Sequence, residues 1–174
     1  KTDKIVLETL QKNTAPACAF ASYYSNHEDI LCIMPSDHYI ENNKEFLKTL
    51  EKAITLAKKN FLVTIGAKAL EPNRNYGYII PSKKTNLKDS FEIERFVEKP
   101  SLTIAKNIIK KNALWNTGIL VVKNRVLVSL FNKYSRNIYN MALESCKNSK
   151  LEKEFHVLDK KFLKGIKEIS IDYA

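Results

Sequence analysis

Residues 91–122 read FEIERFVEKPSLTIAKNIIKKNALWNTGILVV, and this stretch decides the class of fold. It opens with an apolar run at residues 91–97, which is typical of a buried strand. A helical segment with one apolar face follows Pro100, formed by Leu102, Ala105, Ile108 and Ile109. A second apolar run at residues 118–122 indicates another strand. The order of strand, helix and strand predicts an α/β domain.

The same alternation extends along the chain. Further strands are predicted at residues 4–7, 30–34, 61–65 and 76–80. Helices are predicted at residues 15–26, 43–59, 124–147 and 151–162. The polar residues 82–90 separate two of the strands, which indicates a hairpin. We therefore expect an α/β fold with a mixed, mostly parallel sheet flanked by helices, and no repeat or linker divides the 174 residues into more than one domain.

Composition excludes several classes of protein. A hydrophobic content of 44% is that of a globular chain with a buried core. The three cysteines, Cys18, Cys32 and Cys146, are odd in number and widely spaced, so they suit neither a disulfide framework nor a zinc site. A reducing cytoplasm is the simplest setting for them. No apolar run approaches the ~20 residues that span a bilayer, so we expect no membrane partner.

The net charge of +10 raises the alternative of a nucleic-acid binder. The lysine pairs argue against this alternative, because they are spread along the chain with acidic residues between them. Solvated lysines that attract anionic metabolites are the preferred interpretation.

Asp37 and His38 directly follow the strand predicted to end at Met34. Ligands of open α/β sheets bind at the carboxyl ends of strands, where a carboxylate can hold Mg²⁺ beside phosphate oxygens. The same residues could equally cap a turn. The sequence alone leaves both readings open.

Two further segments suit a sugar phosphate. Gly77 stands between Tyr76 and Tyr78, where the missing Cβ would admit a ligand, although a turn or bulge explains it as well. Glu98 could accept hydrogen bonds from hydroxyls and Lys99 could neutralise a phosphate, or the two form an exposed ion pair. In a regular strand they would point to opposite faces.

Two segments place amide side chains beside strand or helix ends. Asn116 precedes Gly118 in the motif WNTG, and its side-chain amide can both donate to and accept from a sugar hydroxyl. The alternative explanation of this motif is a tryptophan packed beside a turn, without a binding role. Asn13 or Thr14 can act as the N-cap of the next helix, which by itself would account for both residues.

The order of these motifs is more specific than any one of them. The succession NTAPA, PSDH, YGYI, FVEKP, WNTG and SIDYA, from about Ile5 to Ala174, resembles the mannose-1-phosphate guanylyltransferases. The resemblance is to the long bacterial type, often bifunctional, that also carries a mannose-6-phosphate isomerase domain.

The resemblance implies a Rossmann-like nucleotidyltransferase fold and the conversion of GTP and mannose 1-phosphate to GDP-mannose and pyrophosphate. It implies a role for each motif residue. Asp37 would hold Mg²⁺, and Lys99 would meet the sugar phosphate as the second catalytic residue. Gly77, Glu98 and Asn116 would contact mannose, and Asn13 and Thr14 would lie against the nucleoside. Asp172 and Tyr173 match a family motif, but the resemblance implies no particular role for them. A cytoplasmic enzyme, compatible with assembly into a homo-oligomer, is expected.

The chain also departs from the family pattern. The glycine-rich phosphate loop GGxGxRLWP is missing, because the four glycines, Gly66, Gly77, Gly118 and Gly165, are isolated. The family continues beyond SIDYA, so we expect a domain incomplete at both ends. Lys12 stands where the family usually has arginine, and residues 73–75 stand where the family usually has Pro-Glu-Thr. These differences keep two alternatives open: a nucleotidyltransferase of this fold for another sugar phosphate or nucleotide, and a non-catalytic sugar-nucleotide binding module.

Overall fold

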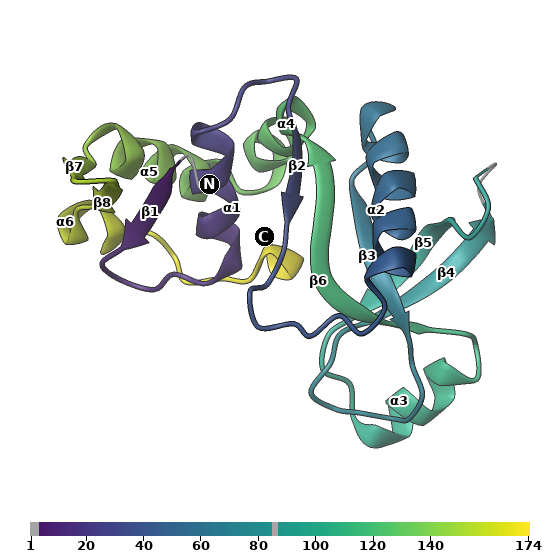
Figure 1. Ribbon diagram of the computed structural model, residues 1–174. Coiled ribbons are helices and arrows are strands. Elements are labelled where there is room, and N and C mark those ends of the chain that lie inside the picture. Colours follow the sequence, from purple (N-terminus) through teal and green to yellow (C-terminus); the bar gives the residue numbers. More distant parts are fainter. Residues whose placement is uncertain (1–3, 85–86) are drawn as a thin grey trace. The chain divides into compact units, whose positions relative to one another are not determined.

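The computed structural model describes residues 4–84 and 87–174, and the chain divides into two compact units. We call Lys1–Leu31 with Lys123–Ala174 the terminal unit and Cys32–Val122 the central unit. Figure 1 labels the helices and strands of both. The expectation of one nucleotidyltransferase domain over residues 1–174 stays a prediction. Within the described ranges, no helix is both long and apolar enough to cross a membrane.

The terminal unit combines a small sheet with helices. Its sheet has the order β1-β8-β7, formed by Ile5–Glu8, Phe155–Leu158 and Lys150–Glu152. β1 pairs in parallel with β8, and β7 pairs antiparallel with β8. The helical elements are α1 (Thr14–Tyr23), α4 (Asn124–Tyr134), α5 (Arg136–Lys147), α6 (Lys160–Leu163) and the 3₁₀ helix η1 (Ile171–Tyr173). α1 packs against α4 and α5 and buries most of its length between them.

A buried asparagine ties α1 to α4. The side chain of Asn124 is buried, and its Oδ1 accepts a 2.6 Å hydrogen bond from the hydroxyl of Ser22. Its Nδ2 group donates to the carbonyl oxygens of Ser22, Ser25 and Asn26 at 3.0 to 3.2 Å. The two N–H protons of one side-chain amide are thus shared among three carbonyl oxygens at and just beyond the end of α1.

The helix prediction for residues 124–147 is confirmed with one interruption, and the prediction for residues 151–162 is wrong. Residues 124–147 form two helices, because Ser135 leaves the helical conformation with φ −144° and ψ 43°. Residues 151–162 form the β7–β8 hairpin followed by the short α6. Parallel pairing with β1, which sets Ile5 opposite Phe155, holds β8 extended. This long-range pairing outweighs the local helical pattern.

The central unit is built on the larger sheet. The strand order is β2-β6-β4-β5, and β3 also pairs with β6. The strands are β2 (Ile30–Ile33), β3 (Val63–Lys68), β4 (Tyr78–Lys84), β5 (Phe91–Val97) and β6 (Leu114–Lys123), and the helices are α2 (Asn43–Lys58) and α3 (Leu102–Ile109). The predicted hairpin is confirmed as β4–β5, and its connection includes residues 85–86, which lie outside the described residues.

The ladders described for this sheet are antiparallel, so the prediction of a mostly parallel sheet is not confirmed there, whereas the small sheet of the terminal unit is mixed. β6 runs antiparallel to both β3 and β4, and β4 runs antiparallel to β5. The hairpin reverses the chain at its short connection, and this reversal accounts for one of these antiparallel ladders.

One face of this sheet packs against α3. Tyr78 is fully buried there, in a cluster that contains Ala105 and Ile108 from α3. The Tyr78 hydroxyl donates to the carbonyl oxygen of Asn73 at 2.9 Å and accepts from its backbone N–H at 2.8 Å. Because side chains alternate along a strand, Gly77 lies on the opposite face.

α2 packs against β3, beside which it lies in Figure 1. Its apolar stripe, which the helical spacing predicts, consists of Phe46, Leu50, Ala53, Ile54 and Ala57. The residues that face inward include Ala53 and Ala57, which are buried. Small residues at these positions allow the helix to approach the strand closely.

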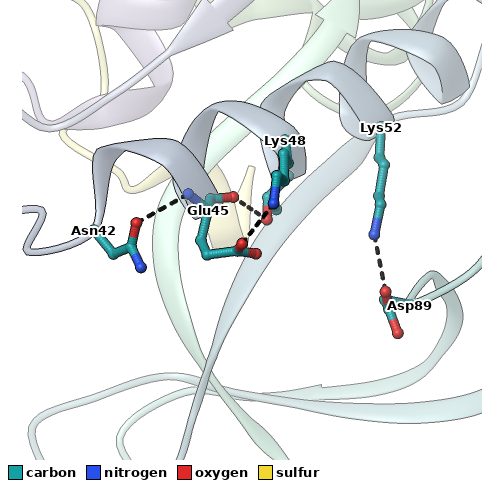
Figure 2. Close-up of polar contacts among 6 residues, drawn as sticks. Asn42, Glu45, Lys48, Lys52 and Asp89 are labelled. Atoms are coloured by element: carbon teal, nitrogen blue, oxygen red, sulfur yellow. Dashed lines mark hydrogen bonds and ion pairs between the residues drawn. The ribbon is translucent and has the colours of Figure 1, made fainter.

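Polar contacts fix the start and the exposed side of α2 (Figure 2). The Asn42 side chain accepts a 3.1 Å hydrogen bond from the backbone N–H of Glu45, which makes it the N-cap. Lys48 pairs with Glu45 and Lys52 pairs with Asp89, both at 2.8 Å. Ion pairs as exposed as these contribute about 0 to 1 kcal/mol each. The cap and the buried alanines therefore position the helix.

Candidate functional site

Three residues expected to contact a sugar lie together on one face of the central unit's sheet. The backbone N–H of Asn116, within β6, donates to the carbonyl oxygen of Gly77 at 2.8 Å. A Cβ atom placed at Gly77 would collide with the Glu98 carboxylate and would stand 2.8 Å from Cζ of Phe96 and 3.5 Å from Cβ of Asn116. The missing Cβ of Gly77 therefore lets the Glu98 carboxylate and the Phe96 ring pack closely against its backbone. All of them lie opposite the face that carries Tyr78 and α3.

The side-chain amide of Asn116 is held in one orientation. Its Oδ1 accepts hydrogen bonds from the Thr64 hydroxyl at 3.1 Å and from the backbone N–H of Gly118 at 3.2 Å. The Thr64 hydroxyl also lies 3.2 Å from the carbonyl oxygen of Ile119, so the two acceptors share one proton. Because Oδ1 takes both donors, Nδ2 is directed away from them as a donor.

The WNTG motif lies inside β6, although the strand was expected to begin at its glycine. The register between β3 and β6 shifts between Thr64 and Gly66, which marks a β-bulge. Gly118 has a φ of 70°, a conformation that strongly favours glycine. A Cβ atom at Gly118 would lie 3.5 Å from Pro35. The irregularity thus brings the PSDH turn next to the WNTG motif.

Glu98 and Lys99 form an ion pair with 3.8 Å between Oε1 and Nζ. The expectation of opposite faces depended on a regular strand, but β5 ends at Val97 and Lys99 has a φ of 44°. A non-glycine residue in this region costs on the order of 1 kcal/mol or more, so the surrounding structure must hold it there. The Glu98 side chain is 16% exposed and that of Lys99 is 66% exposed. The pair therefore offers an enclosed acceptor beside an accessible cation.

Asp37 lies in an exposed turn that follows β2, where the sequence predicts it. Among residues 4–84 and 87–174 there is no group of three or more His, Cys, Asp or Glu side chains that could hold a metal ion. Mg²⁺ usually takes one or two protein carboxylates and completes its shell with water and substrate phosphates. The donor set at Asp37 therefore fits a metal ion that is shared with a nucleotide, and does not form a complete protein site.

Residues 12–15 of the terminal unit lie against residues 169–171. Asn13 is the N-cap of α1, because its Oδ1 accepts from the backbone N–H of Thr14 at 2.8 Å, and its own φ is 71°. The Thr14 hydroxyl donates to Ser170 Oγ at 3.3 Å and accepts from the backbone N–H of Ile171 at 2.8 Å. The motifs NTAPA and SIDYA therefore meet. The predicted nucleoside contacts of Asn13 and Thr14 stay predictions.

A pocket of about 480 Å³ lies beside Asn13, within the size range of small-molecule sites. Its wall combines the apolar Val6 with the carboxylates of Glu8 and Glu168 and the side chain of Lys12. Burial raises the pKa of Glu8 above its ordinary value, and a hydrogen bond from the backbone of Lys12 opposes this rise. Glu8 and Glu168 outnumber Lys12 among the charged residues of the wall, which disfavours phosphate groups and leaves the uncharged part of a ligand as the better occupant.

Comparison with known proteins defines the family. The family model described as nucleotidyl transferase matches residues 2–161. The chain belongs to the nucleotidyl transferase family. Mannose-1-phosphate guanylyltransferase of Escherichia coli is 32% identical to it, over 99% of this chain and 39% of that protein. The alginate biosynthesis protein AlgA of Pseudomonas aeruginosa is 30% identical, over 98% of this chain and 36% of that protein. This nucleotidyl transferase chain thus spans about two fifths of the length of these relatives.

Solved structures agree with the fold class. A Helicobacter pylori protein named mannose-6-phosphate isomerase superposes with a TM-score of 0.87 and 32% identity, over 97% of this chain and 66% of that one. A Thermus thermophilus protein named mannose-1-phosphate geranyltransferase gives a TM-score of 0.83 and 26% identity, over 96% of this chain and 48% of that one. The predicted nucleotidyltransferase fold is confirmed.

Sequence reasoning missed several residues that shape the site of this nucleotidyl transferase. Phe96 stands two residues before Glu98, so strand alternation already puts both on one face. Thr64 is 52 residues from Asn116, and no local pattern connects them. Glu8 lines the pocket at the end of a predicted strand, the position at which Asp37 was noticed.

Proposed function

We propose that the protein carrying this chain transfers a guanylyl group from GTP to mannose 1-phosphate and forms GDP-mannose and pyrophosphate. The observation that carries the proposal is the convergence of Gly77, Glu98 and Asn116 on one face, with Lys99 adjacent, in a chain of the nucleotidyl transferase family. The names of relatives such as the Escherichia coli guanylyltransferase support the choice of substrates.

In the proposed reaction a phosphate oxygen of mannose 1-phosphate attacks the α-phosphorus of GTP. The bond from that phosphorus to the bridging oxygen breaks, and pyrophosphate leaves with the electron pair. Glu98 and Asn116 bind sugar hydroxyls beside the backbone of Gly77. Lys99 neutralises the sugar phosphate and orients it for in-line attack. The turn that carries Asn13 and Thr14 forms the nucleoside end of the site.

Asp37 would hold Mg²⁺ together with the nucleotide phosphates. A bound Mg²⁺ would neutralise charge on those phosphates. The exposure of Asp37 in a turn supports this assignment, because shared coordination requires access from solvent.

The proposal includes the setting of the enzyme. A cytoplasmic location suits three free cysteines, two of which are buried. The partners are GTP, mannose 1-phosphate and GDP-mannose, without nucleic acid or membrane. Assembly into a homo-oligomer stays a prediction. A role in polysaccharide biosynthesis is supported by relatives named as alginate and xanthan biosynthesis proteins.

The test is pyrophosphate release by the full-length protein from GTP and mannose 1-phosphate. We expect Asp37→Ala and Lys99→Ala to lose most of this activity, and Lys106→Ala, an exposed lysine on α3, to keep it. Normal turnover in both site variants would remove the assigned roles.

Substrate panels separate the alternatives. Turnover with another sugar phosphate or nucleotide, but not with this pair, would identify a related nucleotidyltransferase. Binding of GDP-mannose without turnover under any condition would identify a binding module. Either result would overturn the proposed reaction.

A further inference from the structure

The turn that carries Asn13 is bracketed by backbone hydrogen bonds to one distant residue. The backbone N–H of Ile169 donates to the carbonyl oxygen of Lys12 at 3.3 Å, and the backbone N–H of Ala15 donates to the carbonyl oxygen of Ile169 at 3.1 Å. Asn13 lies between these two contacts with a φ of 71°. A non-glycine residue keeps such a conformation only when its surroundings enforce it.

Side chains add a directed chain of hydrogen bonds to the same turn. Ser170 Oγ donates to Oδ2 of Asp172 at 2.7 Å, because an ionised carboxylate can only accept. That bond uses the single proton of Ser170, so toward Thr14 it must accept, and the Thr14 hydroxyl donates to it at 3.3 Å. The oxygen of Thr14 is then the acceptor for the backbone N–H of Ile171 at 2.8 Å. The Asp172 carboxylate thus sets the direction of the two bonds that hydroxyl groups donate, while the N–H of Ile171 can only donate.

We propose that Thr14, Ser170 and Asp172 form a hydroxyl relay that positions Asn13 at the terminal-unit pocket, and that Asn13 contacts the nucleoside while Thr14 does not. Thr14 and Asp172 are then positioning residues, which gives the SIDYA motif a role. The inference rests on the proposed function for the presence of a guanine nucleotide. The pocket supports it, because Asn13 lines that pocket.

The relay is tested first without any ligand, by a double-mutant cycle in urea unfolding. Thr14→Val removes the hydroxyl at nearly constant shape, and Asp172→Ala removes the anchor. We expect the double variant to lose less stability than the two single losses added together, because each change breaks the same chain. Additive losses would overturn the relay.

The positioning role is tested by GDP binding to the full-length protein. Thr14→Val and Asp172→Ala should each weaken GDP binding about 3-fold to 10-fold, without further loss in the double variant. Thr14→Ser keeps the hydroxyl and should restore binding, and the KM for mannose 1-phosphate should not change. Asp159→Ala removes the N-cap of α6 and serves as the control that leaves GDP binding unchanged.

The two proposals fail in different ways. Full loss of binding in Thr14→Val with none in Asp172→Ala would make Thr14 a direct contact and overturn the positioning role. Absence of GDP binding in the unmodified protein would overturn the proposed function and the positioning role together, while the unfolding cycle would still decide the relay.

Discussion

Gly77→Ala should separate stability from sugar binding. Among the described glycines Gly118 has a positive φ and Gly77 does not, so alanine can adopt the backbone conformation of residue 77. Alanine also lowers the conformational entropy of the unfolded chain, which stabilises the protein by about 0.4 to 1 kcal/mol. The added Cβ collides with the Glu98 carboxylate and crowds the Phe96 ring, and such overpacking costs about 1 to 3 kcal/mol. The Glu98 carboxylate is the end of a flexible side chain, whereas the Phe96 ring yields only if the whole side chain shifts. We therefore expect a net loss of about 0 to 3 kcal/mol and a folded protein.

The effect on mannose 1-phosphate should be much larger. Glu98 has to move by about the amount of the overlap, and a displacement of roughly 1 Å in a binding group can cost about 100-fold. The assay is steady-state pyrophosphate release together with thermal unfolding. Gly165→Ala is the matched control, since its Cβ would meet only the flexible end of Met141 in the terminal unit. An unchanged KM for mannose 1-phosphate in Gly77→Ala would refute the placement of the sugar.

Three further predictions follow from single contacts. Thr64→Val should raise the KM for mannose 1-phosphate about 3-fold to 10-fold, because the orienting hydrogen bond to Asn116 is lost, whereas Thr64→Ser should not; equal values for both would contradict this. Asn42→Ala should destabilise the protein by about 1 kcal/mol in urea unfolding through loss of the α2 N-cap, with no change in KM, and Asn42→Asp should retain stability. At pH 8 a thiol reagent should modify Cys32 fastest, because burial raises the pKa of Cys18 and of Cys146 to about 12. Below the ordinary thiol pKa of 9.0 these raised pKa values contribute stability to the fold. That contribution should fall as the pH rises from 9 toward 12, as measured by thermal unfolding.

Local pattern was enough to predict elements whose partners are near in sequence. The β4–β5 hairpin follows from two apolar runs around a polar stretch, and α2 follows from a stripe that ends in buried alanines. The β7–β8 hairpin was missed because β8 is stabilised by pairing with β1, about 150 residues earlier. No pattern within residues 151–162 contains that information, so the helical spacing there was misleading.

The features of the site likewise depend partly on neighbouring residues and partly on contacts between residues far apart in the sequence. Alternation along β5 accounts for the shared face of Phe96 and Glu98. The departure of Lys99 from the strand could not be read from residue types, because lysine rarely adopts a positive φ. The contact between Thr14 and Ser170 joins positions 156 apart. Only the resemblance to a family marked both segments as functional, and it did not indicate that they touch.

The assignment of motifs to units makes the proposed function separable by experiment. Gly77, Glu98 and Asn116 belong to the central unit, and the ladders described around them join β3, β4, β5 and β6. Asn13 and Thr14 belong to the terminal unit and are held by residues 169–171. Substitutions that alter one set should therefore change the KM of one substrate and spare the other. A variant such as Thr64→Val that weakened GTP and mannose 1-phosphate equally would show that the two sets do not bind separate halves of the reaction, and the division of roles would have to be abandoned.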